Sequence, residues 1–210
     1  MSFWKDQLRF ELRNTPRSLR LLARRLGLVQ TLAVTAELAA HQAIGRPWRG
    51  YPPPTSKKEK ASRKQAGPAI LLYQILKRRF GDYEALDITG EIVTAGAVEF
   101  LSIVVPVVRP EDYENVPQAE QLRRLTEVAD RFPNGDIAPP HIEADLSFGY
   151  DVVRCHFPEL FKMLGVPELA PLFCRGDKIF FDRHQPYLEM RRTTTIAEGG
   201  EVCDFRFFWK

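Results

Sequence analysis

Three cysteines and two aspartates in the last third of the chain are the residues whose types could do covalent or acid–base chemistry. Cys174 and Asp177 stand three residues apart in Cys-Arg-Gly-Asp, with further cations at Arg175, Lys178 and Arg183. Cations near a thiol lower its pKa and raise its nucleophilic thiolate fraction. Asp177 is spaced to act as a general base or to contact an amidine nitrogen. The segment therefore predicts a reactive thiol at Cys174.

Cys155 and Cys203 have two interpretations. Strand alternation places Cys155 with Val153 and Phe157, and it places Cys203 with Phe205 among other aromatic residues. A free cysteine among apolar side chains usually packs in a core. The alternative is that both line the same site as Cys174.

Arg192 also has two interpretations, as a structural residue or as a ligand-binding residue. It falls on the more apolar face of a predicted strand over residues 187–196. A buried guanidinium needs a partner. Asp204 is one candidate, as a structural pair; a substrate carboxylate is the other. Alternation puts Cys203 and Asp204 on opposite faces of the last strand. Both reach one cavity only if that strand is bulged near Gly199-Gly200.

The cysteines show no familiar metal-binding spacing. Cys-x-x-Cys is absent, and adding His156 or Asp177 gives no known zinc pattern. The sequence also has no Gly-rich phosphate loop and no Ser-centred nucleophile elbow. We therefore expect neither a metal nor a cofactor.

The spacing of apolar residues predicts helices over most of the first 130 residues. We expect Pro16 to open a second helix, residues 45–65 to form a polar loop, and a new helix to begin near Gly67-Pro68. The further helices that we expect span residues 83–105, 111–132, 158–164 and 167–174.

The pattern changes to strand alternation in the last third of the chain. Residues 148–157 suggest a strand, and residues 187–196 and 202–209 suggest a hairpin that turns at Gly199-Gly200. These elements predict an α+β fold, in which a helical N-terminal part packs on a small, mainly antiparallel C-terminal β-sheet.

Charge is distributed unevenly along the 210 residues. Residues 1–80 carry 17 Lys and Arg against 4 Asp and Glu, a net charge of +13, within a chain whose net charge is +3. Such a segment can contact an anionic membrane, nucleic acid or the protein's own acidic half. We expect a basic extension and linker over residues 1–60 and a hydrolase-like domain over residues 61–210. Three unpaired cysteines and no signal-peptide pattern favour a cytoplasmic protein.

Four separated motifs resemble the L-2-amino-thiazoline-4-carboxylic acid hydrolase family. They are Arg-Cys-His-Phe at residues 154–157, Gly-Val-Pro-Glu-Leu at residues 165–169, Cys-Arg-Gly-Asp at residues 174–177, and the closing run over residues 192–206. Together with a similar upstream helix, the resemblance covers about residues 68–208.

The resemblance implies a ring-opening hydrolysis of a small cyclic isothiourea carboxylate. Arg192 would then hold the carboxylate, and Asp177 or Asp204 would contact the amidine. A cysteine, among Cys155, Cys174 and Cys203, would act as nucleophile or lie against the ring sulfur. Thr194 and His156 complete the substrate-binding set that the matching motifs imply.

Two other function classes stay open. The closing motif is also similar to vinyl-reductase-type domains, which bind a small molecule and need not catalyse. The basic, aromatic N-terminus, with Phe3, Trp4 and Phe10, is compatible with a peripheral membrane adaptor. The partner that we expect is a small-molecule carboxylate, with no nucleic acid; the sequence allows an oligomer.

Overall fold

The structure, a computed structural model, describes residues 3–143 and 146–210. Its helices are α1 (Phe3–Ala43), α2 (Lys57–Phe80), α3 (Asp82–Val104), α4 (Gln118–Ala129), α5 (His156–Met163) and α6 (Ala170–His184). Its strands are β1 (Gly135–Ile137), β2 (His141–Glu143), β3 (Leu146–Cys155), β4 (Leu188–Arg191) and β5 (Cys203–Trp209). Three short 3₁₀ turns, η1 (Pro110–Asp112), η2 (Pro167–Leu169) and η3 (Ile196–Glu198), complete the described elements.

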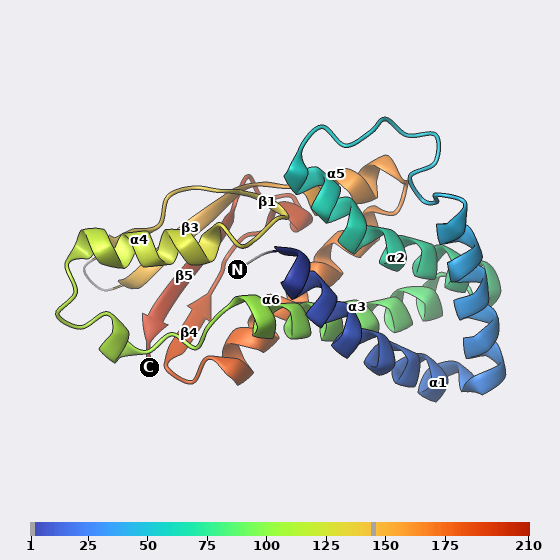
Figure 1. Ribbon diagram of the computed structural model, residues 1–210, viewed down its shortest axis with the longest axis horizontal. Coiled ribbons are helices and arrows are strands. Elements are labelled where there is room, and N and C mark those ends of the chain that lie inside the picture. Colours follow the sequence, from blue (N-terminus) through green and yellow to red (C-terminus); the bar gives the residue numbers. More distant parts are fainter. Residues whose placement is uncertain (1–2, 144–145) are drawn as a thin grey trace.

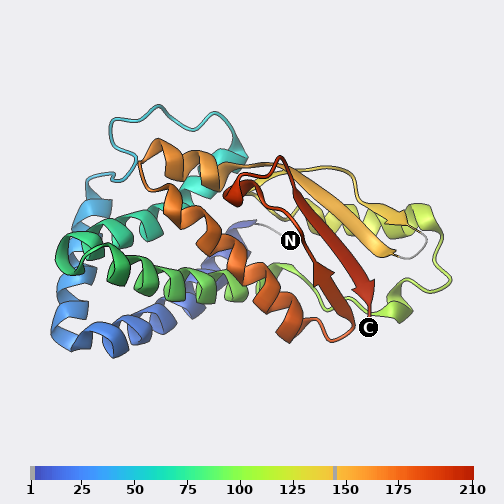
Figure 2. The ribbon, with the colours of Figure 1, turned by 180° about the vertical axis from the view of Figure 1, so that it is seen from behind.

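The predicted α+β class is confirmed, with α1, α2 and α3 at one end of the molecule and the sheet at the other (Figure 1). All strand pairs are antiparallel, in the order β1-β3-β5-β4, and β2 also pairs with β3. Helix α4 lies over one face of the sheet, and Figure 2 shows the opposite face without a covering helix among the described residues.

Helix α1 is bent at Gly27 and not at Pro16, where we expected a new helix. Gly27 has φ 75°, a left-handed conformation that glycine adopts without steric cost, whereas the helix continues through Pro16. The first arm of α1 is tied to α3 by ion pairs from Arg13 to Glu99 and from Arg25 to Asp87. Part of the basic N-terminal charge is therefore matched by the protein's own acidic half.

Helix α2 begins at Lys57, ten residues before the predicted start. The Ser56 side chain accepts a hydrogen bond from Glu59 N, and the Glu59 carboxylate accepts one from Thr55 N. This reciprocal cap starts the helix inside the lysine-rich segment, and Pro68 lies within the helix. The predicted loop is correspondingly shorter, covering residues 44–56.

The connection between β4 and β5 is longer than the predicted hairpin turn. Strand β4 ends at Arg191, and the chain reaches β5 through residues 192–202, which include η3. Gly199, with φ 95°, ends η3 and does not form a two-residue turn. Residues 111–132 likewise hold a shorter helix than expected, since α4 begins only at Gln118 and ends at Ala129.

Within the described residues, no helix is both long enough and apolar enough to cross a bilayer.

Candidate functional site

A cavity of about 800 Å³ lies between the helical end and the sheet. Its walls come from α1, α2, α3 and α6, and its floor comes from β3 and β5. Five of the eight residues predicted to be catalytic or substrate-binding line this cavity: Cys155, Cys174, Asp177, Arg192 and Cys203.

The sheet floor is built by directly paired residues of β3 and β5. Tyr150 lies opposite Phe205 with stacked rings 5.4 Å apart, and Val152 lies opposite Cys203. All four line the cavity, because residues two apart on a strand share a face. Cys203 therefore follows the predicted alternation along β5.

Cys155 reaches the cavity through a bulge in β3. Asp136 pairs with Arg154 but the next residue of β1 pairs with Val152, so Val153 is an extra residue. Val153 is 50% exposed, and after it the alternation is shifted by one residue. β5 pairs with β3 and with β4 without a register shift, so the predicted bulge in β5 is wrong, and the bulge that shapes the site lies in β3.

Cys174 and Asp177 lie on one face of α6, which continues past residue 174, where we had expected the helix to end. A three-residue spacing brings two side chains to the same side of a helix. Gly176 between them packs against α3, since a Cβ at this position would overlap the Cβ of Ala97. Close contact of α3 and α6 holds both residues at the cavity.

Arg192 leaves the end of β4 and contacts α6. Its Nη1 donates to Asp177 Oδ2 at 2.7 Å, and its Nη2 donates to the Cys174 carbonyl oxygen at 3.1 Å. The guanidinium carbon also lies 5.0 Å from the centroid of the Phe205 ring. The alternative in which Arg192 pairs with Asp204 is wrong, because the carboxylate that Arg192 contacts is that of Asp177. Arginine carries five N–H donors, and these two contacts leave others for a ligand.

Asp204 and Thr194 do not line the cavity. Asp204 accepts hydrogen bonds from Thr193 N at 2.9 Å and from Thr194 N at 2.7 Å. Burial raises the pKa of Asp204, but the hydrogen bond from the Thr193 hydroxyl together with these two backbone bonds lowers it below its usual value. Asp204 thus holds the start of the β4–β5 connection, on the side of β5 away from Cys203.

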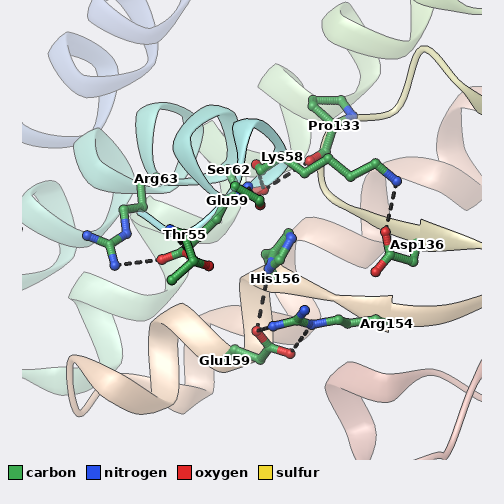
Figure 3. A network of polar contacts seen from close by, with 11 residues as sticks. Thr55, Lys58, Glu59, Ser62, Arg63, Pro133, Asp136, Arg154, His156 and Glu159 are labelled. Carbon is green, nitrogen blue, oxygen red and sulfur yellow. Dashed lines mark hydrogen bonds and ion pairs between the residues drawn. The ribbon is translucent and has the colours of Figure 1, made fainter. Parts of the chain in front are cut away.

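His156 is also absent from the cavity wall. It is the first residue of α5 and is buried, with Nδ1 3.4 Å from Glu159 Oε2 (Figure 3). In the same region Lys58 donates to Asp136 at 2.9 Å. Figure 3 places these polar contacts between the start of α2, β1 and α5, and the bond from Lys58 to Asp136 links α2 to the sheet.

Burial raises the pKa of all three thiols and brings that of Cys155 to about 12. At Cys174 burial is the largest effect; Asp177 adds to it, and Arg192 acts in the opposite direction. The expected lowering of the Cys174 pKa is therefore wrong. The cations that suggested it are exposed, and one of them, Lys178, pairs with Asp182 at 2.9 Å.

Burial also raises the pKa of Asp177, while the contact with Arg192 lowers it in part. The Asp177 side chain is 24% exposed, and we attribute that exposed surface to the cavity that it lines. A carboxyl group with a raised pKa exchanges protons closer to neutral pH, which suits a general acid or base. Among the described residues, no three His, Cys, Asp or Glu side chains are grouped to hold a metal ion.

Sequence reasoning missed the residues that α1 contributes to the cavity wall. Phe10 lines it and packs edge-on against Phe100, with ring centroids 6.0 Å apart, so it is not a free aromatic at the surface. The side chains of Phe3 and Trp4 lie outside the described part of the chain. Tyr150 was also missed, because strict alternation from Cys155 puts it on the opposite face of the strand, and only the bulge at Val153 brings both residues to the cavity.

The fold and this site define an α+β protein with an internal cavity that has an ion pair and three thiols on its wall. The chain belongs to the L-2-amino-thiazoline-4-carboxylic acid hydrolase family, whose model matches residues 61–207. The match begins within α2 and continues through β4 and most of β5, and α1 lies outside it. Searches of curated proteins and of solved structures give no significant match.

Proposed function

We propose that the protein is a hydrolase that opens a small cyclic amidine or isothiourea carboxylate, of the 2-aminothiazoline-4-carboxylate type, to an N-carbamoyl amino acid. The observation that carries the proposal is the partly buried Arg192–Asp177 pair on the wall of a cavity that three thiols also line. Family membership supports the same class of reaction.

Water adds to the amidine carbon in the proposed step. The water oxygen forms a bond to that carbon, and Asp177 takes one of its protons. The ring carbon–sulfur bond then breaks, its electron pair stays on sulfur, and Asp177 returns the proton to the sulfur. The second water proton ends on the former ring nitrogen, and the carbon becomes a ureido carbonyl. The product carries a free thiol, and no oxidant or reductant is needed.

Asp177 fits the role of base better than any of the cysteines does. Thiols with raised pKa values are protonated near neutral pH and are poor nucleophiles. The raised pKa of Asp177 gives a stronger base than an ordinary carboxylate. Arg192 orients Asp177 and offers its remaining N–H donors to the substrate carboxylate. In this assignment the thiols surround the ring sulfur.

The test is release of free thiol from the thiazoline by the purified protein and its Asp177→Asn variant. Asparagine keeps an oxygen for Arg192 but cannot accept the proton, so we expect kcat to fall by about 10²–10⁴-fold. Asp182→Asn is the matched control, because Asp182 is exposed on the same helix. An active Asp177→Asn enzyme would contradict the base assignment. No thiol release by the unchanged protein would exclude this substrate.

A second candidate is a small-molecule-binding module without catalysis. The raised pKa values of all three thiols favour it, because none has the character of an activated nucleophile. This alternative predicts that Asp177→Asn changes ligand affinity and that no chemical product appears with any cyclic amidine carboxylate.

A further inference from the structure

The cavity is large for the heterocycle in the proposed reaction. Its volume of about 800 Å³ lies in the upper part of the range of about 300–1,000 Å³ for pockets that hold drug-sized ligands. A single five-membered ring with two small substituents fills only part of that space. The rest of the cavity must be filled either by water or by a further part of the ligand.

Much of the wall away from Arg192 and Asp177 is apolar. Residues of α1, α2 and α3 contribute aliphatic side chains that are buried or partly buried in the helical core and also face the cavity: Leu22, Val34, Leu38, Leu72, Ile92 and Val93. Water in such a space makes few hydrogen bonds, so displacing it by an apolar group is favourable.

The cavity meets solvent along the seam between α1 and α2. Leu19 lines the cavity and is 41% exposed, which places it at the boundary with solvent. Lys64 and Glu11, which also line the cavity, form an ion pair of 3.0 Å across this seam, with side chains 42% and 45% exposed. The seam is therefore the side from which a ligand can enter.

The geometry points to an amphiphilic substrate with an apolar substituent. We propose that its cyclic amidine carboxylate head lies at Arg192 and Asp177, and that an extended apolar body runs between α1, α2 and α3 toward the seam. This inference rests on the proposed function for the head group. Helix α1, which lies outside the family match, closes the apolar part and sets the size of ligand that the protein accepts.

Affinity should then depend on the length of the apolar substituent. Burial of each further methylene group corresponds to roughly fourfold tighter binding until the space is filled. The probes are 2-aminothiazoline-4-carboxylates that carry N-alkyl chains from methyl to dodecyl, together with n-alkanols of equal chain length. Titration calorimetry gives Kd for each probe, and free thiol release is measured separately on the same series.

Two matched variants locate the apolar body. Leu38→Trp fills the cavity from α1, whereas Leu28→Trp makes the same change on the same helix at a side chain that is 74% exposed and outside the cavity wall. Leu22→Trp, from the other arm of α1, replaces Leu38→Trp if that variant loses its helical circular dichroism. Arg192→Lys tests the head group.

We expect chain-length-dependent binding that Leu38→Trp weakens at least tenfold for the long chains only. Leu28→Trp should leave the whole series unchanged, and Arg192→Lys should weaken every carboxylate probe but none of the alkanols. Equal affinity for methyl and dodecyl probes would overturn the inference, as would equal effects of Leu38→Trp and Leu28→Trp. Chain-length-dependent binding without thiol release would leave the inference standing and exclude these thiazolines as substrates of the proposed hydrolase.

Discussion

Among the polar contacts of the site, we expect the ion pair of Arg192 with Asp177 to lower the free energy of unfolding most when only one of its two residues is replaced. Their side chains are 13% and 24% exposed. Arg192→Met removes the cation and two hydrogen bonds, and it leaves the Asp177 carboxylate without its partner. Removing one partner of a buried pair costs about 3–5 kcal/mol. We expect the free energy of unfolding to fall by about that amount at pH 8.

The double variant should recover much of this loss. Replacing Asp177 by Leu in the Arg192→Met background removes the uncompensated charge, and a pair replaced by apolar side chains of similar volume is often neutral. Urea unfolding of the wild type, both single variants and the double variant gives the coupling free energy of the pair.

The pH dependence gives an independent check. Burial already raises the pKa of Asp177 above the value of an unfolded aspartate, and loss of Arg192 removes the contact that lowers it. The folded state then binds the proton more tightly than the unfolded state does, so stability is lost as pH rises through the folded pKa. Arg192→Met should therefore be less destabilised at pH 5 than at pH 8. A loss below about 1 kcal/mol at pH 8, or strictly additive single variants, would refute the assignment of a coupled, partly buried pair.

Three further outcomes follow from the structure. All three cysteines should react slowly with limiting iodoacetamide near neutral pH, since a pKa of about 12 at Cys155 means a very small thiolate fraction; mass spectrometry showing one fast thiol, at Cys174 or elsewhere, would contradict this. Gly176→Ala should lower the free energy of unfolding by about 1–3 kcal/mol through overlap with Ala97, with exposed Lys178→Ala as control, and an unchanged urea midpoint would argue against close α3–α6 packing. The exposed leucines of basic α1, including Leu12 at 68%, should give salt-sensitive flotation with anionic but not zwitterionic liposomes; no flotation, or flotation that Leu12→Glu leaves unchanged, would count against a membrane contact.

Local sequence patterns predicted the class of the fold and much of β5. Alternation placed Cys203 and Asp204 on opposite faces, and the structure keeps them there, with Cys203 on the cavity wall and Asp204 bonded to Thr193 and Thr194. Cys174 and Asp177 are three residues apart, and because they lie in a helix, this spacing puts both side chains on the same side of it. These features depend on neighbours in the chain, so periodicity is sufficient to find them.

Helix boundaries were less predictable at prolines, because a proline can either begin a helix or lie inside one. Pro16 and Pro68 were expected at helix starts, yet both lie inside helices. The start of α2 depends on contacts of Ser56 and Glu59, and the bend of α1 depends on Gly27. A proline near a polar stretch does not by itself distinguish these cases.

The amino-acid sequence by itself determined an α+β protein with an arginine, aspartates and three thiols concentrated in its last third. Only the tertiary structure decided that Arg192 pairs with Asp177, that a bulge at Val153 turns Cys155 toward the cavity, and that α1 closes the apolar wall. Tertiary structure also reversed the expected pKa shift of Cys174. The physical reason is that ion pairing and desolvation depend on which segments meet in space, and residues far apart in the chain carry no local signal of that meeting.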